Sequence, residues 1–190
     1  MPNNRGMKIL IRTGTNIIEN DISHMSKNFK TYRISGQDTI LKAPMFVYRK
    51  RLELMEELLE ELLCFSTEGN IILVEGKRDR KSLKQLGITG KIELVTHRPL
   101  TDICERVAAT GKDVVILTDW DRRGNILEKK IAEHLQHHGV KIKRQLRERI
   151  LFLVKKDIKD VESLYTHIQR LRQIADHNHN YNNTDDNVFI

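Results

Sequence analysis

Residues 71–79 read IILVEGKRD and residues 114–124 read VVILTDWDRRG, and these two stretches indicate the fold more clearly than any other part of the chain. Each begins with four consecutive aliphatic residues, which is typical of a short strand buried on both faces. Each then changes to acidic, basic and glycine residues, as expected where a strand ends and a loop leads into a helix. The two stretches therefore predict two buried strands with charged side chains at their carboxyl ends.

Helical and strand patterns alternate around these two strands. Another strand is expected at 92–95, and helices are expected at 77–86, 99–111 and 125–138. Glycine ends or follows each of these helical patterns, as is common at helix C-termini. Alternating strands and helices predict βαβ units and therefore an α/β fold, a mainly parallel sheet flanked by helices.

The remaining segments suggest how the chain is organised. An amphipathic helix is expected before the first strand, with apolar residues every three or four positions at Leu52, Met55, Leu58, Leu59, Leu62 and Leu63. A closing helix is expected at 160–174. Residues 140–142 and 150–154 are candidates for edge strands, although 145–151 equally fits a helix. We expect an irregular N-terminal extension (1–45), one α/β domain (46–175) and a disordered polar tail (176–190).

Length and composition exclude several classes of protein. The 190 residues are 39% apolar and 31% charged, which suits one soluble globular domain with extensions. The sequence contains no secretory signal and no apolar run near the roughly 18 residues that would cross a bilayer, so no membrane partner is expected. Cys64 and Cys104 lack metal-ligand or disulfide-framework spacing, which fits a reducing cytoplasm.

The formal charge of +7 favours a polyanionic partner, because every Lys or Arg near a phosphate backbone can release counterions. A basic stretch includes Lys141, Lys143, Arg144, Arg147, Arg149, Lys155, Lys156 and Lys159. This stretch is either a solvated surface or a track for a nucleic-acid backbone.

Three carboxylates stand where the predicted strands end: Glu75, Asp119 and Asp121. If the two strands are neighbours, these groups lie close together. Two unit charges about 5 Å apart repel by roughly 3 kcal/mol at an effective dielectric near 20, so the cluster requires protonation or a cation. We favour Mg²⁺, with Mn²⁺ as a substitute, because Mg²⁺ prefers a few carboxylates together with waters and phosphates.

Basic residues flank these acids directly, at Lys77, Arg78, Arg122 and Arg123. A metal-binding centre surrounded by phosphate-binding groups is what metal-assisted phosphoryl transfer needs. The alternative is structural: Asp119 or Asp121 could cap the following helix, and Asp79 could favour a helix start through the macrodipole. Trp120 could either stack on a base or pack between loop and core.

The motifs EGKRD (75–79) and DWDRRG (119–124) resemble those of TOPRIM domains, the catalytic fold of topoisomerases, bacterial primases, some nucleases and a ribosomal-RNA maturation ribonuclease. The resemblance covers about residues 65–171 and is strongest to small archaeal primase-like TOPRIM proteins. It implies that Glu75 is a general acid/base and that Asp119 and Asp121 bind Mg²⁺. From its place at the end of the neighbouring strand, we expect Glu75 to join the metal site as well.

The chain departs from this pattern at two positions. Asn125 stands where topoisomerases and the maturation ribonuclease often carry an acid, and Trp120 replaces a small residue or proline. Glu162, in the segment KDVE (159–162), could bring a further carboxylate to the site, and Asp79 is a second accessory candidate. The chain has no room for strand-passage domains and no primase-type zinc module, so neither activity follows from the fold.

Two functions remain after this reading. The leading hypothesis is a Mg²⁺-dependent nuclease or primase-like RNA-processing enzyme that acts on RNA or processed DNA ends. The alternative is a non-catalytic nucleic-acid-binding accessory module in an RNA or DNA processing complex. Nucleotide hydrolysis is disfavoured by the lack of a phosphate-binding G-x-x-x-x-G-K-[ST] loop. The leucine-rich helix could also pair with a second copy of the chain in a homodimer.

Overall fold

The computed structural model describes residues 45–96 and 98–176, and the backbone of four short strands before them. The chain divides into two compact units, residues 1–47 and 48–190. The first contains two antiparallel hairpins: β1 (Leu10–Thr13) with β2 (Asn16–Glu19), and β3 (Tyr32–Arg33) with β4 (Ile40–Leu41). The rest of the expected N-terminal extension, and residues 177–190 of the expected tail, lie outside the described residues.

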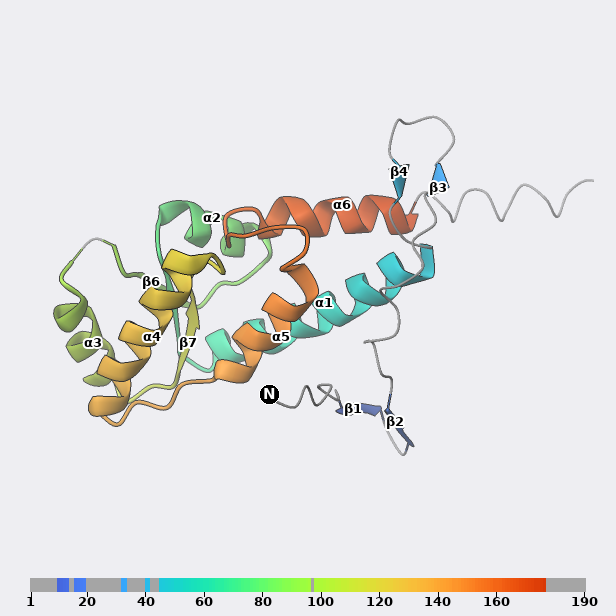
Figure 1. Cartoon of the computed structure of the whole chain (residues 1–190). Coiled ribbons are helices and arrows are strands. Elements are labelled where there is room, and N and C mark those ends of the chain that lie inside the picture. The colour runs from blue at the N-terminus through green and yellow to red at the C-terminus, as the bar shows by residue number, and fades with distance from the viewer. Residues whose placement is uncertain are drawn as a thin grey trace, which may run out of the picture. The chain divides into compact units, whose positions relative to one another are not determined.

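The second unit is built on a parallel sheet of three strands, β5 (Ile71–Val74), β6 (Lys91–Leu94) and β7 (Val114–Leu117). Their order is β6-β5-β7, so β5 lies in the middle. The strands β6 and β7 are labelled in Figure 1, with α3 and α4 nearby. A single parallel bridge adds Ile142 beside Val114, where the sequence suggested an edge strand. The α/β fold with a mainly parallel sheet is therefore confirmed.

Six helices accompany the sheet, and three of them directly follow a strand. Their bounds are α1 (Met45–Thr67), α2 (Lys77–Gln85), α3 (Leu100–Ala108), α4 (Arg122–His137), α5 (Arg144–Val154) and α6 (Leu164–Asp176). The strand considered at 150–154 was wrong, and the helical alternative is correct. Leu146, Ile150 and Val154 recur every four residues and are buried, so the helical period decides this segment.

Alternating side chains of the strands supply two separate cores. Ile72 and Val74 of β5 pack with buried residues of α1, α2, α5 and α6. Ile71 and Leu73 point to the opposite face and pack with α3 and α4. Because the sheet is covered on both faces, all four residues of β5 and all four of β7 are buried, which explains their unbroken apolar sequence.

This arrangement brings functional candidates to one edge of the sheet. In parallel strands the carboxyl ends meet at the same edge, and helices α2 and α4 begin beside the ends of β5 and β7. Among the described helices, none combines the length and the apolar character needed to cross a bilayer.

Candidate functional site

Glu75 and Asp119 meet at the carboxyl edge of the sheet. Val74 and Leu117 are paired across β5 and β7, so the residues that follow them emerge side by side. The backbone N–H of Asp119 donates to Oε1 of Glu75 at 3.1 Å. The structure therefore joins two of the three predicted metal ligands through a bond between the ends of neighbouring strands.

The loop between α5 and α6 is fastened to this edge by three hydrogen bonds. The N–H of Val161 donates to Oδ1 of Asp119 at 3.0 Å. Trp120 donates its backbone N–H to the Lys159 carbonyl at 3.0 Å and its indole N–H to the Ile158 carbonyl at 3.1 Å. Trp120 is only 9% exposed, so its packing role is the one that this structure supports, and its ring is not presented to a base.

The same loop and α2 bring further carboxylates to the edge. We call the resulting set the acid cluster: Glu75, Asp79, Asp119, Asp160 and Glu162. Asp79 is buried in the first turn of α2 and accepts the N–H of Gly76 at 2.8 Å, as a helix-start residue would. Asp160 accepts the N–H of Ser163 at 2.7 Å.

The pKa values of two members of the acid cluster are raised. Burial raises the pKa of Asp119 to about 6; nearby Asp79, Glu75 and Asp160 raise it too, while the Val161 hydrogen bond lowers it. Burial also raises the pKa of Asp79, against the lowering effect of its bond from Gly76. Asp121, the third predicted ligand, is not among the groups that raise these two pKa values, whereas Asp160, which was not a named candidate, is.

Asp121 takes a different position. Its side chain is exposed and caps α4, since Oδ1 accepts the N–H of Gly124 at 2.7 Å. The structural alternative considered for the aspartate pair thus describes Asp121, whereas the side chain of Asp119 bonds to the α5–α6 loop instead.

Two substitutions at Asp121 separate capping from metal binding. Asp121→Ala removes the cap and should lower the free energy of unfolding by about 1 kcal/mol. Asp121→Asn keeps an oxygen that accepts from Gly124 and should retain stability, yet it removes a charged ligand and should weaken Mg²⁺ binding. Urea unfolding and calorimetric Mg²⁺ titration measure the two effects. Equal Mg²⁺ affinity in wild type and Asp121→Asn would show that Asp121 only caps.

Arg147 lies beneath the turn of the DWD motif, and nothing in the sequence distinguished it from its basic neighbours. It is 8% exposed and donates to the Asp119 carbonyl at 3.2 Å and to Oδ1 of Asn125 at 3.1 Å. Asn125 in turn donates to the carbonyls of Trp120 at 3.1 Å and Asp121 at 2.7 Å. Asn125, at the position where topoisomerases and the maturation ribonuclease often have an acid, therefore stabilises the turn through these hydrogen bonds.

Cations surround the acid cluster on the surface. Lys77, Arg122 and Arg123 are exposed, and both arginines line a small cavity with Asp121 and Ile126. Arg78 lies 3.6 Å from Glu162, and both side chains are at least half exposed, so this ion pair is weak. In the basic stretch from 141 to 159, Arg147 is buried and so is not available to a nucleic-acid backbone.

The donor chemistry of the edge suits a hard divalent cation. Carboxylate oxygens are the ligands that Mg²⁺ prefers, and a cation would offset the repulsion from Asp79, Glu75 and Asp160, which adds to burial in raising the pKa of Asp119. Within residues 45–96 and 98–176, however, no three His, Cys, Asp or Glu side chains are already arranged as a metal site. The backbone N–H of Asp119 bonds to the Glu75 carboxylate, whereas Asp121 uses Oδ1 to cap α4.

The raised pKa of Asp119 predicts how stability depends on pH. Its carboxyl binds a proton more tightly when folded, so without metal this group disfavours folding increasingly as pH rises from its ordinary 3.8 to about 6. Asp119→Asn removes that penalty and should gain stability relative to wild type between about pH 4 and about pH 7.5. Urea unfolding in EDTA measures it, with exposed Asp102→Asn as control. If the difference in unfolding free energy between Asp119→Asn and wild type is the same at about pH 4 and about pH 7.5, the prediction is contradicted.

Comparisons with known proteins identify the domain that carries these residues. Residues 70–153 match the Toprim domain family. A UPF0292 protein of Methanosarcina barkeri is 53% identical over 126 residues, which span 66% of this chain and 88% of that protein. A UPF0292 protein of Methanocaldococcus jannaschii is 39% identical over 64% of this chain and 97% of its own length.

A solved structure of a protein from Aquifex aeolicus matches with a TM-score of 0.51 and 28% identity, covering 57% of this chain and 96% of that one. The Toprim match confirms the resemblance noted from the two motifs and indicates a metal-dependent function related to nucleic acid. The extent and identity of the matches to small archaeal proteins show that this chain belongs to the UPF0292 family and carries a Toprim domain.

Proposed function

We propose that the protein is a Mg²⁺-dependent phosphodiester enzyme acting on nucleic acid, a nuclease or a primase-like RNA-processing enzyme. The observation that carries this proposal is the junction of Glu75 and Asp119 within the acid cluster, at the edge where the Toprim motifs end. Exposed cations on both sides of that edge and a net charge of +7 suit a polyanionic substrate.

Each residue of the site has a role in this proposal. Glu75, Asp119 and Asp121 would hold Mg²⁺, which supplies neutralisation of the charge on the phosphate. Glu75 uses one carboxylate oxygen to accept from Asp119, so the other can take the proton of an attacking water or return it to the leaving oxygen.

The remaining site residues bind and position the substrate. Lys77, Arg122 and Arg123 would contact the phosphates beside the reacting bond, and Arg78 joins them once released from Glu162. The proposed substrates are RNA or processed DNA ends rather than intact duplex.

A second candidate is a non-catalytic nucleic-acid-binding accessory module. Two observations favour it: Asn125 occupies a position that is often acidic in Toprim enzymes and is engaged by Arg147, and Asp121 is engaged as a helix cap. In this alternative the fold and its basic surface bind nucleic acid, and the acids serve only the structure.

One experiment separates the two functions. Purified protein is incubated with labelled single- and double-stranded RNA and DNA in Mg²⁺, Mn²⁺ or EDTA, and both binding and chain length are measured. Metal-dependent cleavage or synthesis supports the enzyme. Binding without turnover supports the accessory module, and absence of binding contradicts both.

Location and assembly also remain proposals. Cys64 and Cys104 are both free thiols, which supports a reducing compartment such as the cytoplasm. A second copy of the chain or a larger processing complex is proposed as a further partner.

A further inference from the structure

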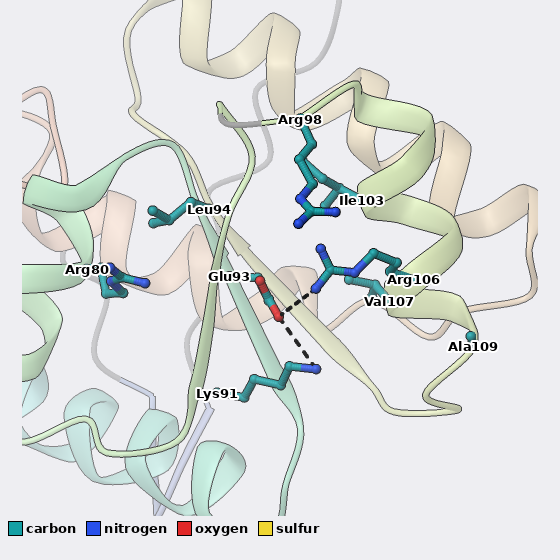
Figure 2. A pocket seen from close by; sticks show the side chains of 9 residues that line it. All are labelled: Arg80, Lys91, Glu93, Leu94, Arg98, Ile103, Arg106, Val107 and Ala109. Carbon is teal, nitrogen blue, oxygen red and sulfur yellow. Dashed lines mark ion pairs between the residues drawn. The ribbon is translucent and has the colours of Figure 1, made fainter.

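A cavity of about 400 Å³ follows the outer edge of β6, between that strand and α3 (Figure 2). We call it the β6 groove. It is lined by Arg80, Lys91, Glu93, Leu94, Arg98, Ile103, Arg106, Val107 and Ala109. Its size is that of a typical small-ligand pocket, large enough for a nucleotide unit. It lies outside the acid cluster, and neither the Toprim motifs nor the sequence reading pointed to it.

The groove is basic because of how side chains alternate along β6. Lys91 and Glu93 point to the α3 side of the sheet, where Arg98 and Arg106 also direct their guanidinium groups (Figure 2). Arg80 enters from α2, on the opposite side of the strand. Four cations and one carboxylate therefore line the groove.

The single carboxylate neutralises only part of this charge. Glu93 lies 3.6 Å from Lys91 and 3.7 Å from Arg106. Among the described residues, the side chains of Arg80 and Arg98 have no ion-pair or hydrogen-bond partner. Two unpaired guanidinium groups on one cavity leave a site that favours an anion.

The lining indicates which part of a nucleic acid would fit. Guanidinium groups bind phosphate through paired hydrogen bonds, which suits the backbone of a strand. Among the described residues that line the groove none is aromatic, so these residues offer no platform on which a base could stack. It is therefore suited to phosphate and sugar rather than to base recognition.

The groove is connected to the acid cluster at its carboxyl end. The hydroxyl of Thr96 donates to the Glu75 carbonyl at 2.6 Å, and the N–H of Val95 donates to the Val74 carbonyl at 2.9 Å. The segment that carries Arg98 is thus attached to Glu75 itself. Arg80 lies in the first turn of α2, the helix that begins two residues after Glu75. A strand lying in the groove would run toward the proposed reaction site.

We infer that the β6 groove binds the phosphate backbone of a single nucleic-acid strand and directs it to the acid cluster, an inference that rests on the proposed function. Arg80 and Arg98 supply the principal contacts, and Arg106 and Lys91 add to them through the charge that Glu93 leaves unneutralised. Binding at the groove does not depend on base sequence and weakens as salt concentration rises.

The test uses the full chain with Arg80→Gln and Arg98→Gln combined. The matched control is Lys129→Gln with Lys130→Gln, which removes the same charge from exposed positions of α4 outside the groove. Fluorescence anisotropy in EDTA measures binding of labelled oligouridylate and oligothymidylate over a series of salt concentrations. The groove variant should bind about tenfold more weakly. The slope of log K against log salt concentration should be shallower by about 1.4, as expected when two phosphate contacts on a single strand are lost.

The outcomes distinguish this inference from the proposed function. Weaker binding in the groove variant alone supports the groove, whether or not the wild type cleaves its ligand. Equal losses in both variants would show a diffuse charge effect and overturn it, as would unchanged binding in the groove variant. If the wild-type chain binds neither oligonucleotide, the inference fails, while the proposed function is decided separately by the incubation with single- and double-stranded RNA and DNA.

Discussion

Glu75→Gln should lower metal-dependent turnover of nucleic acid by about 10²- to 10⁴-fold while leaving affinity for the nucleic acid within about twofold. Glutamine has nearly the same shape as glutamate and keeps an oxygen that can accept the N–H of Asp119. The hydrogen bond between residues 75 and 119, which connects the ends of β5 and β7, is therefore retained. What the amide cannot do is take a proton from water or give one to a leaving oxygen.

Turnover is measured as the rate of cleavage or extension of a labelled strand at saturating Mg²⁺, with affinity measured separately in EDTA. Glu133→Gln, an exposed substitution on α4, is the matched control and should behave like wild type. A Glu75→Gln protein that turns over its substrate at the wild-type rate would remove Glu75 from the mechanism.

Gly124→Ala should cost about 3 kcal/mol or more of unfolding free energy, the upper range for a residue forced into a packed site. A Cβ at position 124 would meet the Asp119 carbonyl oxygen and lie 2.6 Å from its carbonyl carbon. Alanine in a helix normally gains about 1 kcal/mol over glycine, but that gain is smaller than the cost of displacing backbone.

Hydrogen bonds hold the backbone of Asp119 and Gly124 in place. The Asp119 carbonyl accepts from Arg147, and the hydroxyl of Thr118 donates to the Gly124 carbonyl at 2.9 Å. Moving Asp119 away from a Cβ would disturb these bonds and the contact with Glu75. The substitution should therefore also reduce Mg²⁺ binding.

Gly76→Ala is the matched control, because a Cβ there would lie 4.0 Å from its nearest neighbour, Oδ2 of Asp79. Its backbone is extended, with φ of −143°, so an alanine fits without strain. Urea unfolding should find Gly76→Ala within about 1 kcal/mol of wild type. Similar stabilities for Gly124→Ala and Gly76→Ala would contradict the close approach of α4 to the turn.

The parts of this molecule that sequence predicted well are those governed by local pattern. β5 and β7 begin and end where their aliphatic runs do, because burial on both faces excludes polar residues. Segment 150–154 was less certain because a short apolar run fits either a strand or a helix, and only the packing of Leu146 and Ile150 decides between them.

The candidate site depended on contacts between distant segments, which no local pattern contains. Glu75 and Asp119 meet because β5 and β7 are neighbours in the sheet. The sequence does not show which strands are neighbours, so it predicted this contact only if β5 and β7 pair. The bond between Val161 and Asp119 joins segments 42 residues apart. Arg147 looked like any other residue of a basic stretch, although it is buried under the turn.

The β6 groove had one signal in the sequence that could have revealed it. Lys91 and Glu93 are polar residues at alternate positions of a strand whose other residues are apolar, which marks one side as exposed. Arg80, Arg98 and Arg106 come from three different segments, and only the folded chain shows that they line the same cavity.

Calorimetric titration of the wild-type protein with Mg²⁺, beside Asp119→Asn, tests the central claim most directly: the carboxylates at this edge hold a divalent cation. We expect saturable binding by the wild type that is at least tenfold weaker in Asp119→Asn, since a half-buried charged ligand is lost. Binding should also weaken in the wild type below about pH 6, where a proton competes for Asp119. No saturable binding, or equal affinity in both proteins, would contradict the account.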